Sequence, residues 1–333
     1  MGKHSAPRRG SLAFRPRGRK GSHLTRVRNW PKIDSEKPTL LGAIAFKAGT
    51  IHIITVDDRE KTPNTGKPLF NPATVIATAP LFLIGIRGYR KTDAGRQAFG
   101  EVYAKDLPKT LTRKVRISST GASRKFKHLE ESLNLLESLS GIISVSPKDA
   151  GLSQKKPYVL EVGVGGGDLK SQYGYLKENI GKEIKVGEIF KAGAYVDTHG
   201  VTKGKGFEGP VTRHGIKRKE HKARKSVRAV GALNPWSPTT VRYTVPRAGQ
   251  MGFHQRVDRN HRVIVVGNEQ DQPVTPKGGF NHFGVISKEY LLLRGSVPGP
   301  AGRPVTLSYP MRPPSSKIEA PKILSISSVP LEQ

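Results

Sequence analysis

The chain has 333 residues, of which 35% are hydrophobic, and its 57 Lys or Arg against 26 Asp or Glu give a formal net charge of +31. That hydrophobic fraction supports a modest core, but a charge of this size opposes compaction unless a polyanion supplies counter-charge. Because cysteine is absent, disulfides, thiolate zinc sites and cysteine nucleophiles are excluded. No apolar run approaches the roughly 20 residues that span a bilayer, so we expect a soluble, intracellular, polyanion-bound protein.

The excess positive charge is concentrated in two segments. Residues 1–28 hold nine Lys or Arg and no acid, and residues 203–262 hold fifteen Lys or Arg against three acids. The rest of the chain carries an ordinary surface charge for a moderately basic protein. The sequence therefore predicts a globular core with separate basic extensions.

Residues 1–37 are rich in Arg, Gly, Pro and Ser and have little apolar periodicity, which is typical of an extension that does not fold alone. Phe14, Leu24 and Trp30 lie among its cations. We expect these three side chains to stack on bases or to pack in RNA crevices. The alternative is a tail that is merely disordered.

From residue 39 onward, short β-branched runs predict strands. Residues 40–47 and 50–56 predict a pair joined by a tight hairpin at Ala48-Gly49. Similar runs predict further strands at residues 74–78, 81–87, 262–266, 283–287, 290–293 and 304–308. A stripe of leucines predicts a helix over residues 128–139, and a weaker pattern predicts a second over 169–179.

This order of elements predicts a mainly β fold with an α+β insertion. We expect a small β-barrel made of residues 38–75 and 181–333, which carries an extended basic loop at 201–260. Residues 76–180 then form an inserted α+β domain.

An apolar run that ends in glycines, V-L-E-V-G-V-G-G-G-D at residues 159–168, resembles the first motif of class I methyltransferases. In those enzymes an acid and glycines let the backbone approach S-adenosylmethionine. That fold requires several further βα units, whereas here one weak helix precedes the basic loop. The favoured interpretation is a glycine turn that leaves a buried strand, and an RNA methyltransferase remains an alternative.

No catalytic residue, metal site or cofactor is predicted. The histidines at positions 199, 214, 221, 254 and 261 lack i, i+4 ligand spacing and clustered carboxylates. No serine lies in a G-x-S-x-G turn. Because cations surround His214 and His221, we expect neutral rings that contact RNA.

The basic loop contains two further motifs. Trp236 lies between Pro235 and Pro238, which stiffen the turn, so the indole is suited to insertion between bases; the alternative is a local hydrophobic anchor. Downstream, the run of residues 246–254 offers arginine for phosphates, Gln and His for base edges, and glycines for close approach.

We therefore predict that RNA is bound mainly by cations, with a few side chains that stack on bases or donate to their edges. Those of the first extension are Arg8, Arg9, Arg15, Arg17, Arg19, Lys20, Arg26 and Arg28. Those of the basic loop are Lys203, Lys205, Arg213, His214, Lys217, Arg218, Lys219, His221, Lys222, Arg224, Lys225, Arg228, Trp236, Arg242, Arg247, Gln250, His254 and Arg256.

Residues 190–213 resemble the signature of the universal large-subunit ribosomal protein three family (ribosomal protein L-three). The resemblance is carried by Phe190, Asp197, Gly200, Thr202, Gly204-Lys205-Gly206, Gly209 and Arg213. The archaeal branch of the family is resembled at residues 1–28, 233–236, 247–250 and 295–300.

The resemblance implies a six-stranded translation-factor-like barrel with an inserted domain, and extensions that reach through ribosomal RNA toward the peptidyl transferase centre. Trp236 corresponds to the tip of the family's finger, and residues 217–228 to the cationic thread behind it. Ser237 stands where members often carry His. His221 falls where eukaryotic relatives have a histidine that can be methylated.

The function implied is that of a non-enzymatic structural constituent of the large ribosomal subunit in the cytoplasm. It would bind large-subunit RNA early in assembly, contact neighbouring ribosomal proteins and buttress the catalytic centre, without a cofactor, membrane or small-molecule substrate. An RNA methyltransferase and a free-standing RNA chaperone are the alternatives.

Overall fold

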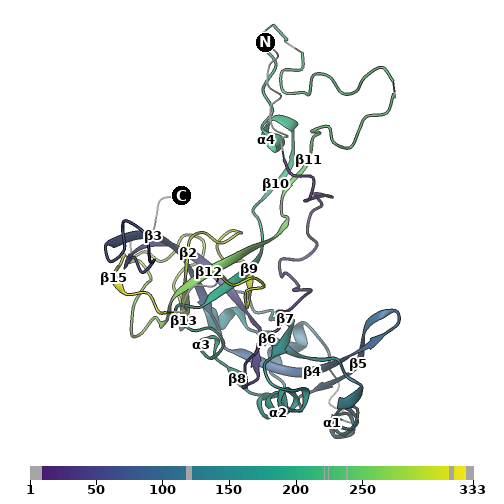
Figure 1. The fold of residues 1–333 in the computed structure, drawn as a ribbon, viewed down its shortest axis with the longest axis vertical. Helices are drawn as coiled ribbons and strands as arrows, with labels where there is room; N and C mark the ends of the chain where they lie inside the picture. Colours follow the sequence, from purple (N-terminus) through teal and green to yellow (C-terminus); the bar gives the residue numbers. More distant parts are fainter. Residues whose placement is uncertain are drawn as a thin grey trace. The chain divides into compact units, whose positions relative to one another are not determined.

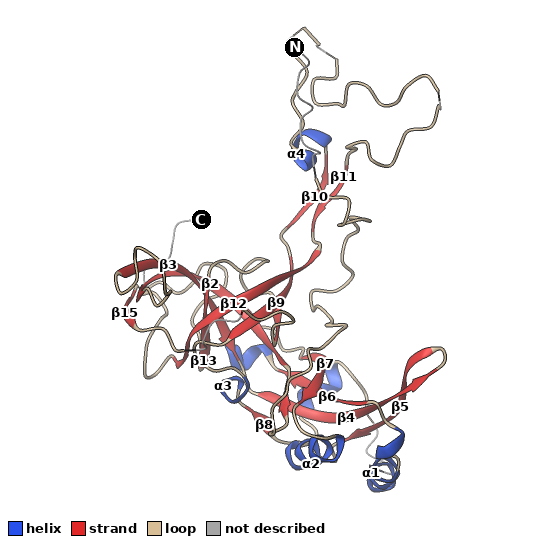
Figure 2. Cartoon of the chain, viewed as in Figure 1, coloured by secondary structure: helices blue, strands red, loops and turns tan. Residues whose placement is uncertain are grey.

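The computed structural model describes residues 10–117, 122–220, 222–223, 225–237, 239–314 and 319–327. It comprises two compact units, which are described separately below. The extension unit is Met1–Ser22 with Val201–Gln255, and the sheet unit is His23–Gly200 with Arg256–Gln333. Strands predominate over helices (Figure 2), which confirms the predicted mainly β class. None of the described helices is long and apolar enough to cross a membrane.

One sheet joins seven strands in the order β14-β9-β12-β13-β3-β2-β15 (Figure 1). These strands are β2 (Gly42–Val56), β3 (Pro68–Thr78), β9 (Tyr195–Val201), β12 (Gln255–Asn268), β13 (Glu289–Arg294), β14 (Pro304–Ser308) and β15 (Ile323–Ile326). Strand β14 pairs with β9 and also with β2. The hydrogen-bonded path through six of the strands therefore returns to the strand where it began.

The 15-residue strand β2 holds this sheet together, because β3 pairs along most of its length while β14 and β15 pair with its two ends. The predicted hairpin at Ala48-Gly49 is wrong. The strand runs through that point with only a register shift between Lys47 and Gly49. A Cβ on Gly49 would lie 2.4 Å from a ring carbon of Phe280. The glycine therefore serves close packing and not a turn.

Replacing Gly49 by alanine should destabilise the protein by about 1–3 kcal/mol, because the added methyl overpacks the contact with Phe280. Chemical denaturation monitored by circular dichroism measures the change. Gly278→Ala is the matched control, since a Cβ there meets no heavy atom within 4 Å. Equal midpoints for the two variants would contradict the packing account.

A second, antiparallel sheet has the order β1-β7-β6-β4-β5, with β8 paired to β4. Its strands are β1 (Thr39–Leu40), β4 (Leu81–Thr92), β5 (Gly95–Tyr103), β6 (Ser138–Val145), β7 (Tyr158–Gly165) and β8 (Glu183–Ile184). The chain passes from the first sheet to the second between β3 and β4, through only Ala79 and Pro80.

The described helices of the sheet unit are few and short. They are α1 (Ala122–Glu131), α2 (Leu169–Asn179), α3 (Val186–Ile189) and the 3-10 turns η1 (Lys109–Arg113), η2 (Leu133–Leu135) and η3 (Pro147–Ala150). Helix α2 confirms the prediction over 169–179. The helix predicted over 128–139 is mostly wrong, because α1 ends at Glu131 and β6 begins at Ser138. The leucines of that stripe are nevertheless all buried: Leu129, Leu133, Leu136 and Leu139.

Five other predicted strands lie within observed ones: 74–78 in β3, 81–87 in β4, 262–266 in β12, 290–293 in β13 and 304–308 in β14. The strand predicted over 283–287 is wrong. That segment turns back at an isolated bridge between Phe280 and Gly284, where His282 has a φ of 62°. Its apolar residues Phe283 and Ile286 are buried, so their hydrophobicity reflects the core and not a strand.

Side chains from both sheets pack into one large core, and every member of that cluster belongs to the sheet unit. Trp30 bridges the two sheets, since a Cβ on Gly42 of β2 or on Gly163 of β7 would lie less than 3 Å from its ring. Leu24 also packs against this core. The expectation that Leu24 and Trp30 stack on RNA bases is therefore wrong, whereas Phe14 remains 55% exposed.

Because none of the described residues in 205–252 belongs to the hydrophobic core, replacing residues 205–252 by a short Gly-Ser linker should leave a cooperatively folding protein. Strands β10 and β11, which the replacement removes, pair only with each other. Differential scanning calorimetry should show one sharp transition near the wild-type temperature. A broad transition, or none, would mean that the extension contributes to the core.

Candidate RNA interface

The extension unit is built on an antiparallel ribbon of β10 (Gly204–Glu208) and β11 (Gly249–Gly252) (Figure 1). Gly252 has a φ of +71°, and a Cβ there would lie 2.0 Å from the carbonyl oxygen of Lys203. Gly206 has a φ of +69°, within the part of β10 where the register shifts. The glycines of this motif thus permit backbone conformations and contacts that other residues disfavour.

The short helix α4 (Pro210–His214) is tied to β11 through one arginine. The Arg213 guanidinium donates from Nε to the carbonyl of Gln250 at 3.1 Å and from Nη1 to that of Arg247 at 3.0 Å. Burial, together with the nearby charge of Arg15, lowers the pKa of Arg213. These bonds fix the guanidinium in place, and none of the described carboxylates forms an ion pair with it.

The N-terminal segment lies beside this ribbon. His254 donates from Nδ1 to the carbonyl oxygen of Gly18 at 2.9 Å. Arg17 places Nη1 3.3 Å from Nε2 of the buried His214, although the two residues are 197 positions apart in sequence. The fold therefore brings the two predicted basic segments together within one unit.

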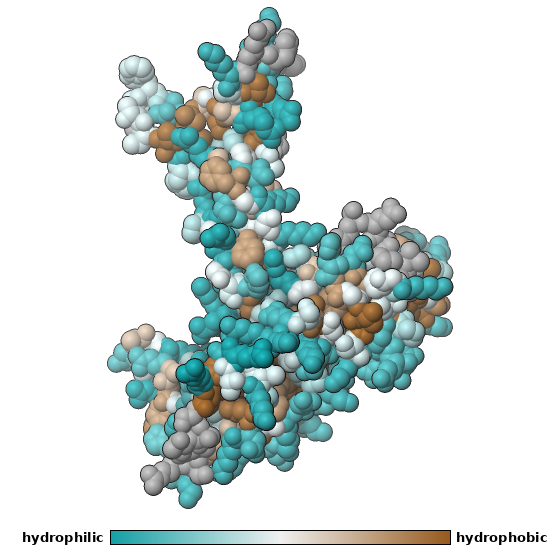
Figure 3. Space-filling view, turned by 180° about the vertical axis from the view of Figure 1, so that it is seen from behind, coloured by the Kyte–Doolittle hydropathy of each residue, from teal (hydrophilic) through white to brown (hydrophobic). Residues whose placement is uncertain are grey.

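The structure leaves most of the predicted RNA-binding cations open to solvent, and much of the visible face in Figure 3 is hydrophilic. The exposed ones are Arg19, Arg26, Arg28, Lys203, Lys205, Lys217, Arg218, Lys222, Lys225, Arg228, Arg242 and Arg247. Those of intermediate exposure are Arg15, Arg17, Lys20, Arg213, Lys219, Gln250, His254 and Arg256. Arg8, Arg9, His221 and Arg224 lie outside the described residues.

The positive charge of the extension unit is not neutralised internally. Residues 10–22 and 201–255 contain sixteen Lys or Arg and two acids, Glu208 and Glu220. Neither glutamate forms an ion pair with a described residue, and the ion pairs found among the described residues all lie in the sheet unit. The unit therefore needs an external anion.

Trp236 is 96% exposed in a segment without helix or strand, so it makes no local hydrophobic anchor in the free chain. Pro235 precedes it, whereas Pro238 lies outside the described residues. Leu233, three residues before Trp236, is another exposed large apolar side chain, at 37%. An indole in this setting is available to an external partner.

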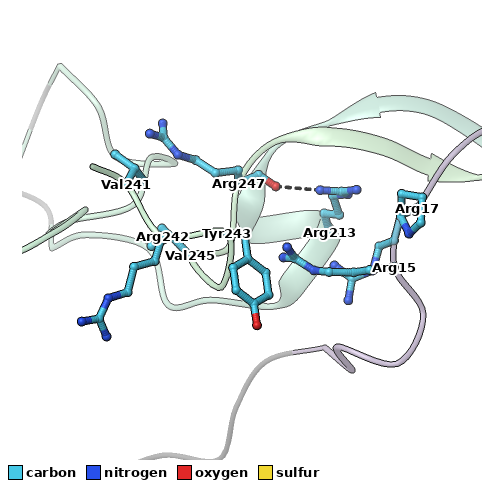
Figure 4. A pocket seen from close by; sticks show the side chains of 9 residues that line it. Arg15, Arg17, Arg213, Val241, Arg242, Tyr243, Val245 and Arg247 are labelled. Atoms are coloured by element: carbon cyan, nitrogen blue, oxygen red, sulfur yellow. Dashed lines mark hydrogen bonds between the residues drawn. The ribbon is translucent and has the colours of Figure 1, made fainter. Parts of the chain in front are cut away.

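A cavity of about 470 Å³ opens between the N-terminal segment, α4 and residues 241–247 (Figure 4). It is lined by Arg15, Arg17, Arg213, Arg242, Arg247 and Tyr243, with Pro16 and two valines. The guanidinium of Arg15 lies over the Tyr243 ring, 5.4 Å from its centroid. Sequence reasoning selected the arginines but missed Tyr243, whose place directly after Arg242 in the basic loop was the available signal.

A further aromatic side chain of the unit, Phe207 on β10, is 79% exposed. The sequence analysis missed this residue too. It lies inside the glycine motif, directly after Gly206. Phe207 is therefore an exposed ring on the strand pair that carries the basic loop, besides the exposed rings of Trp236 and Tyr243 in the same unit.

The described residues contain no group of three or more His, Asp or Glu that could hold a metal ion. His199 in β9 is buried, and its Nε2 lies 2.9 Å from the hydroxyl of Ser308. Burial lowers the pKa of His199, because the charged ring would lose its hydration. His261 is likewise engaged, donating from Nδ1 to the carbonyl of Arg294. These two rings have structural roles in the sheet unit.

The glycine turn after β7 is filled by the chain itself. The amide of Gly167 donates to the carbonyl of Ser35 at 2.8 Å, and a Cβ on Gly166 would lie 2.4 Å from the carbonyl oxygen of Lys37. Strand β7 pairs antiparallel with both neighbours, β6 and β1. A methyltransferase first motif belongs to a parallel sheet with an open turn, so the favoured interpretation as a structural turn fits the geometry.

Comparison with known proteins places the chain. The family model described as Ribosomal protein L3 matches residues 1–328. The chain belongs to the ribosomal protein L3 family. It is 39% identical to the large ribosomal subunit protein uL3 of Methanococcus vannielii, over 98% of this chain and 97% of that protein. It is 40% identical to the uL3 of Methanocaldococcus jannaschii over 97% and 96%, and 37% identical to that of Methanothermobacter thermautotrophicus over 98% of each.

Proposed function

We propose that this chain is a structural constituent of the large ribosomal subunit that binds large-subunit ribosomal RNA and performs no chemistry itself. One observation carries the proposal: residues 10–22 and 201–255 hold sixteen Lys or Arg against two acids, and neither acid forms an ion pair with a described residue. Phosphates supply the missing counter-charge, and most of the affinity comes from the release of their counterions. The large subunit is proposed because the relatives are named as large ribosomal subunit proteins.

The architecture proposed for the sheet unit is a six-stranded translation-factor-like barrel with an inserted α+β domain. Its support is the closed path of pairings β2-β3-β13-β12-β9-β14 and the switch to a second sheet after residue 78. In this scheme residues 38–75 and 181–333 form the barrel and 76–180 the insertion. The sheet unit lies among ribosomal RNA and neighbouring large-subunit proteins, and the extension enters the RNA.

We further propose that the loop with Trp236 at its tip reaches toward the peptidyl transferase centre, and that binding takes place early enough to nucleate assembly. The support is that Trp236 is 96% exposed and follows a run of cations at residues 217–228. The cations attract and hold phosphates, while the indole is free to stack.

Binding of full-length protein to large-subunit RNA should weaken roughly 10³- to 10⁵-fold between 50 and 200 mM salt if six to ten phosphates are contacted. Deleting residues 1–22 removes seven Lys or Arg and should flatten the salt slope by about 0.7–0.9 for each phosphate that is no longer bound. Filter binding over a salt series measures both. Lys177→Ala is the control, because Lys177 is already paired with Glu130 at 3.0 Å and its removal should leave the slope unchanged.

An unchanged slope after the deletion would contradict phosphate contacts in the N-terminal segment. Sedimentation of a tagged chain through a high-salt gradient separates the remaining alternative. A subunit constituent stays with the large subunit, whereas a free-standing RNA chaperone is washed off.

Replacing Trp236 by alanine should leave assembly largely intact, since removing a stack worth about 1–3 kcal/mol spares the phosphate contacts. Chemical reactivity of nucleotides at the catalytic centre should change in purified variant subunits. Trp30→Ala provides the contrast between the only two tryptophans of the chain, because Trp30 packs between the sheets. It should lower the melting temperature of the free protein, whereas Trp236→Ala should not.

Wild-type reactivity throughout the catalytic centre in Trp236→Ala subunits, together with a lowered melting temperature, would instead indicate a local packing role for the indole.

A further inference from the structure

We infer that the cavity around Tyr243 is a binding pocket for a single unstacked nucleotide of the RNA, whose base stacks on the tyrosine ring and whose phosphate is held by the surrounding arginines. The inference rests on the proposed function and specifies one subsite of it. The cavity is lined by residues from three segments, among them Arg15, Arg213, Tyr243 and Arg247 (Figure 4).

The size and chemistry of the cavity suit such an occupant. Its volume of about 470 Å³ falls within the range of about 300–1,000 Å³ that is typical of small-ligand sites. Five of its nine lining residues are arginines, and none is acidic. A neutral or cationic occupant would leave these charges facing one another, whereas a phosphate relieves their repulsion.

Several guanidiniums of the cavity remain available to a ligand. Arg15, Arg242 and Arg247 make no side-chain hydrogen bond or ion pair with any described residue. Arg213 is held by its bonds to two backbone carbonyls, so the wall it forms is fixed before a ligand arrives. A preformed wall lowers the entropic cost of binding.

Tyr243 supplies the stacking surface. Its ring is 71% exposed and its hydroxyl has no partner among the described residues, so most of the ring surface is open to a ligand. The Arg15 guanidinium lies over the ring, and such a pair forms one side of a platform on which a base can stack. An aromatic ring beside guanidiniums is how proteins commonly hold single, splayed-out RNA bases.

The choice of cation supports the same occupant. Every cation of the cavity is arginine, although lysine and arginine are mixed in the run at residues 217–228. Arginine presents a planar fork that binds phosphate through two bonds and stacks on bases, whereas lysine acts as a point charge. A site that only attracted RNA by its charge would not need arginine in preference to lysine.

The test uses full-length protein and large-subunit RNA transcribed in vitro, with 2′-hydroxyl acylation read at each nucleotide. Wild-type protein should change the reactivity of one nucleotide and its stacking neighbours at the site. Tyr243→Ala should return them to the free-RNA pattern and weaken binding roughly 5- to 150-fold with an unchanged salt slope. Tyr243→Phe should keep both the pattern and the affinity, because the ring is retained.

Phe207→Ala is the matched control, since Phe207 is an exposed aromatic of the same unit outside the cavity. It should leave this reactivity pattern unchanged. Arg247→Ala should weaken binding and reduce the salt slope by about one. Melting curves should be alike for all four variants, because Tyr243, Phe207 and Arg247 are exposed.

The pocket is refuted if wild type binds the RNA and Tyr243→Ala binds it with the same affinity and reactivity. Adenosine and uridine monophosphates provide the second arm. Binding of either free nucleotide at micromolar concentration, without competition from the RNA, would assign the cavity to a metabolite and overturn the RNA subsite. Failure of wild-type protein to bind the RNA at all would instead overturn the proposed function.

Discussion

The extension unit carries a positive charge that its own two acids do not neutralise, and this charge determines how the unit is built. One of its arginines, Arg213, is held by the carbonyl oxygens of Gln250 and Arg247, and no described carboxylate pairs with it. A carbonyl fixes a guanidinium in position without cancelling its charge, so each such bond orients a cation for an external anion. With no core of its own, the unit depends for its shape on tight glycine conformations such as that of Gly252, and on these bonds. The same backbone bonds therefore order the extension unit and keep its positive charge available to an external anion.

In the sheet unit, residues 25–37 at the start of the unit are packed firmly against the two sheets. Trp30 packs on Gly42 in one sheet and Gly163 in the other, and the backbone of residues 35–37 fills the glycine turn after β7. Nearer the N-terminus, Thr25 is fully buried, and its hydroxyl donates to the carbonyl of His199. The segment is therefore anchored from residue 25 onward. An anchored chain loses less entropy when the residues before it are ordered on RNA than a free tail does.

The sequence predicted the charge distribution, the mainly β class, helix α2 and the burial of the leucine stripe, but it mistook several elements. Apolar spacing reports which side chains face a core, and Leu129, Leu133, Leu136 and Leu139 do so from a helix, a 3-10 turn, its cap and a strand in succession. A glycine between two β-branched runs is equally compatible with a turn and with close packing, and only the position of Phe280 decides for Gly49. Such contacts are set by tertiary structure, which local pattern does not contain.

The candidate site, too, was only partly predictable from the sequence. The basic segments could be found from the sequence by counting Lys and Arg, whereas the cavity is assembled from three segments that lie between residues 15 and 247. Tyr243 gains its meaning only from Arg15 over its ring. The cations and the cavity also have different physical roles. A run of mixed lysines and arginines supplies long-range attraction that does not depend on the RNA sequence. A cavity whose cations are all arginine, with an aromatic ring in its wall, can hold one nucleotide in one orientation. Electrostatic attraction alone would let the extension slide along the RNA. In this proposal the charge provides affinity, and the cavity fixes the position of the extension on the RNA.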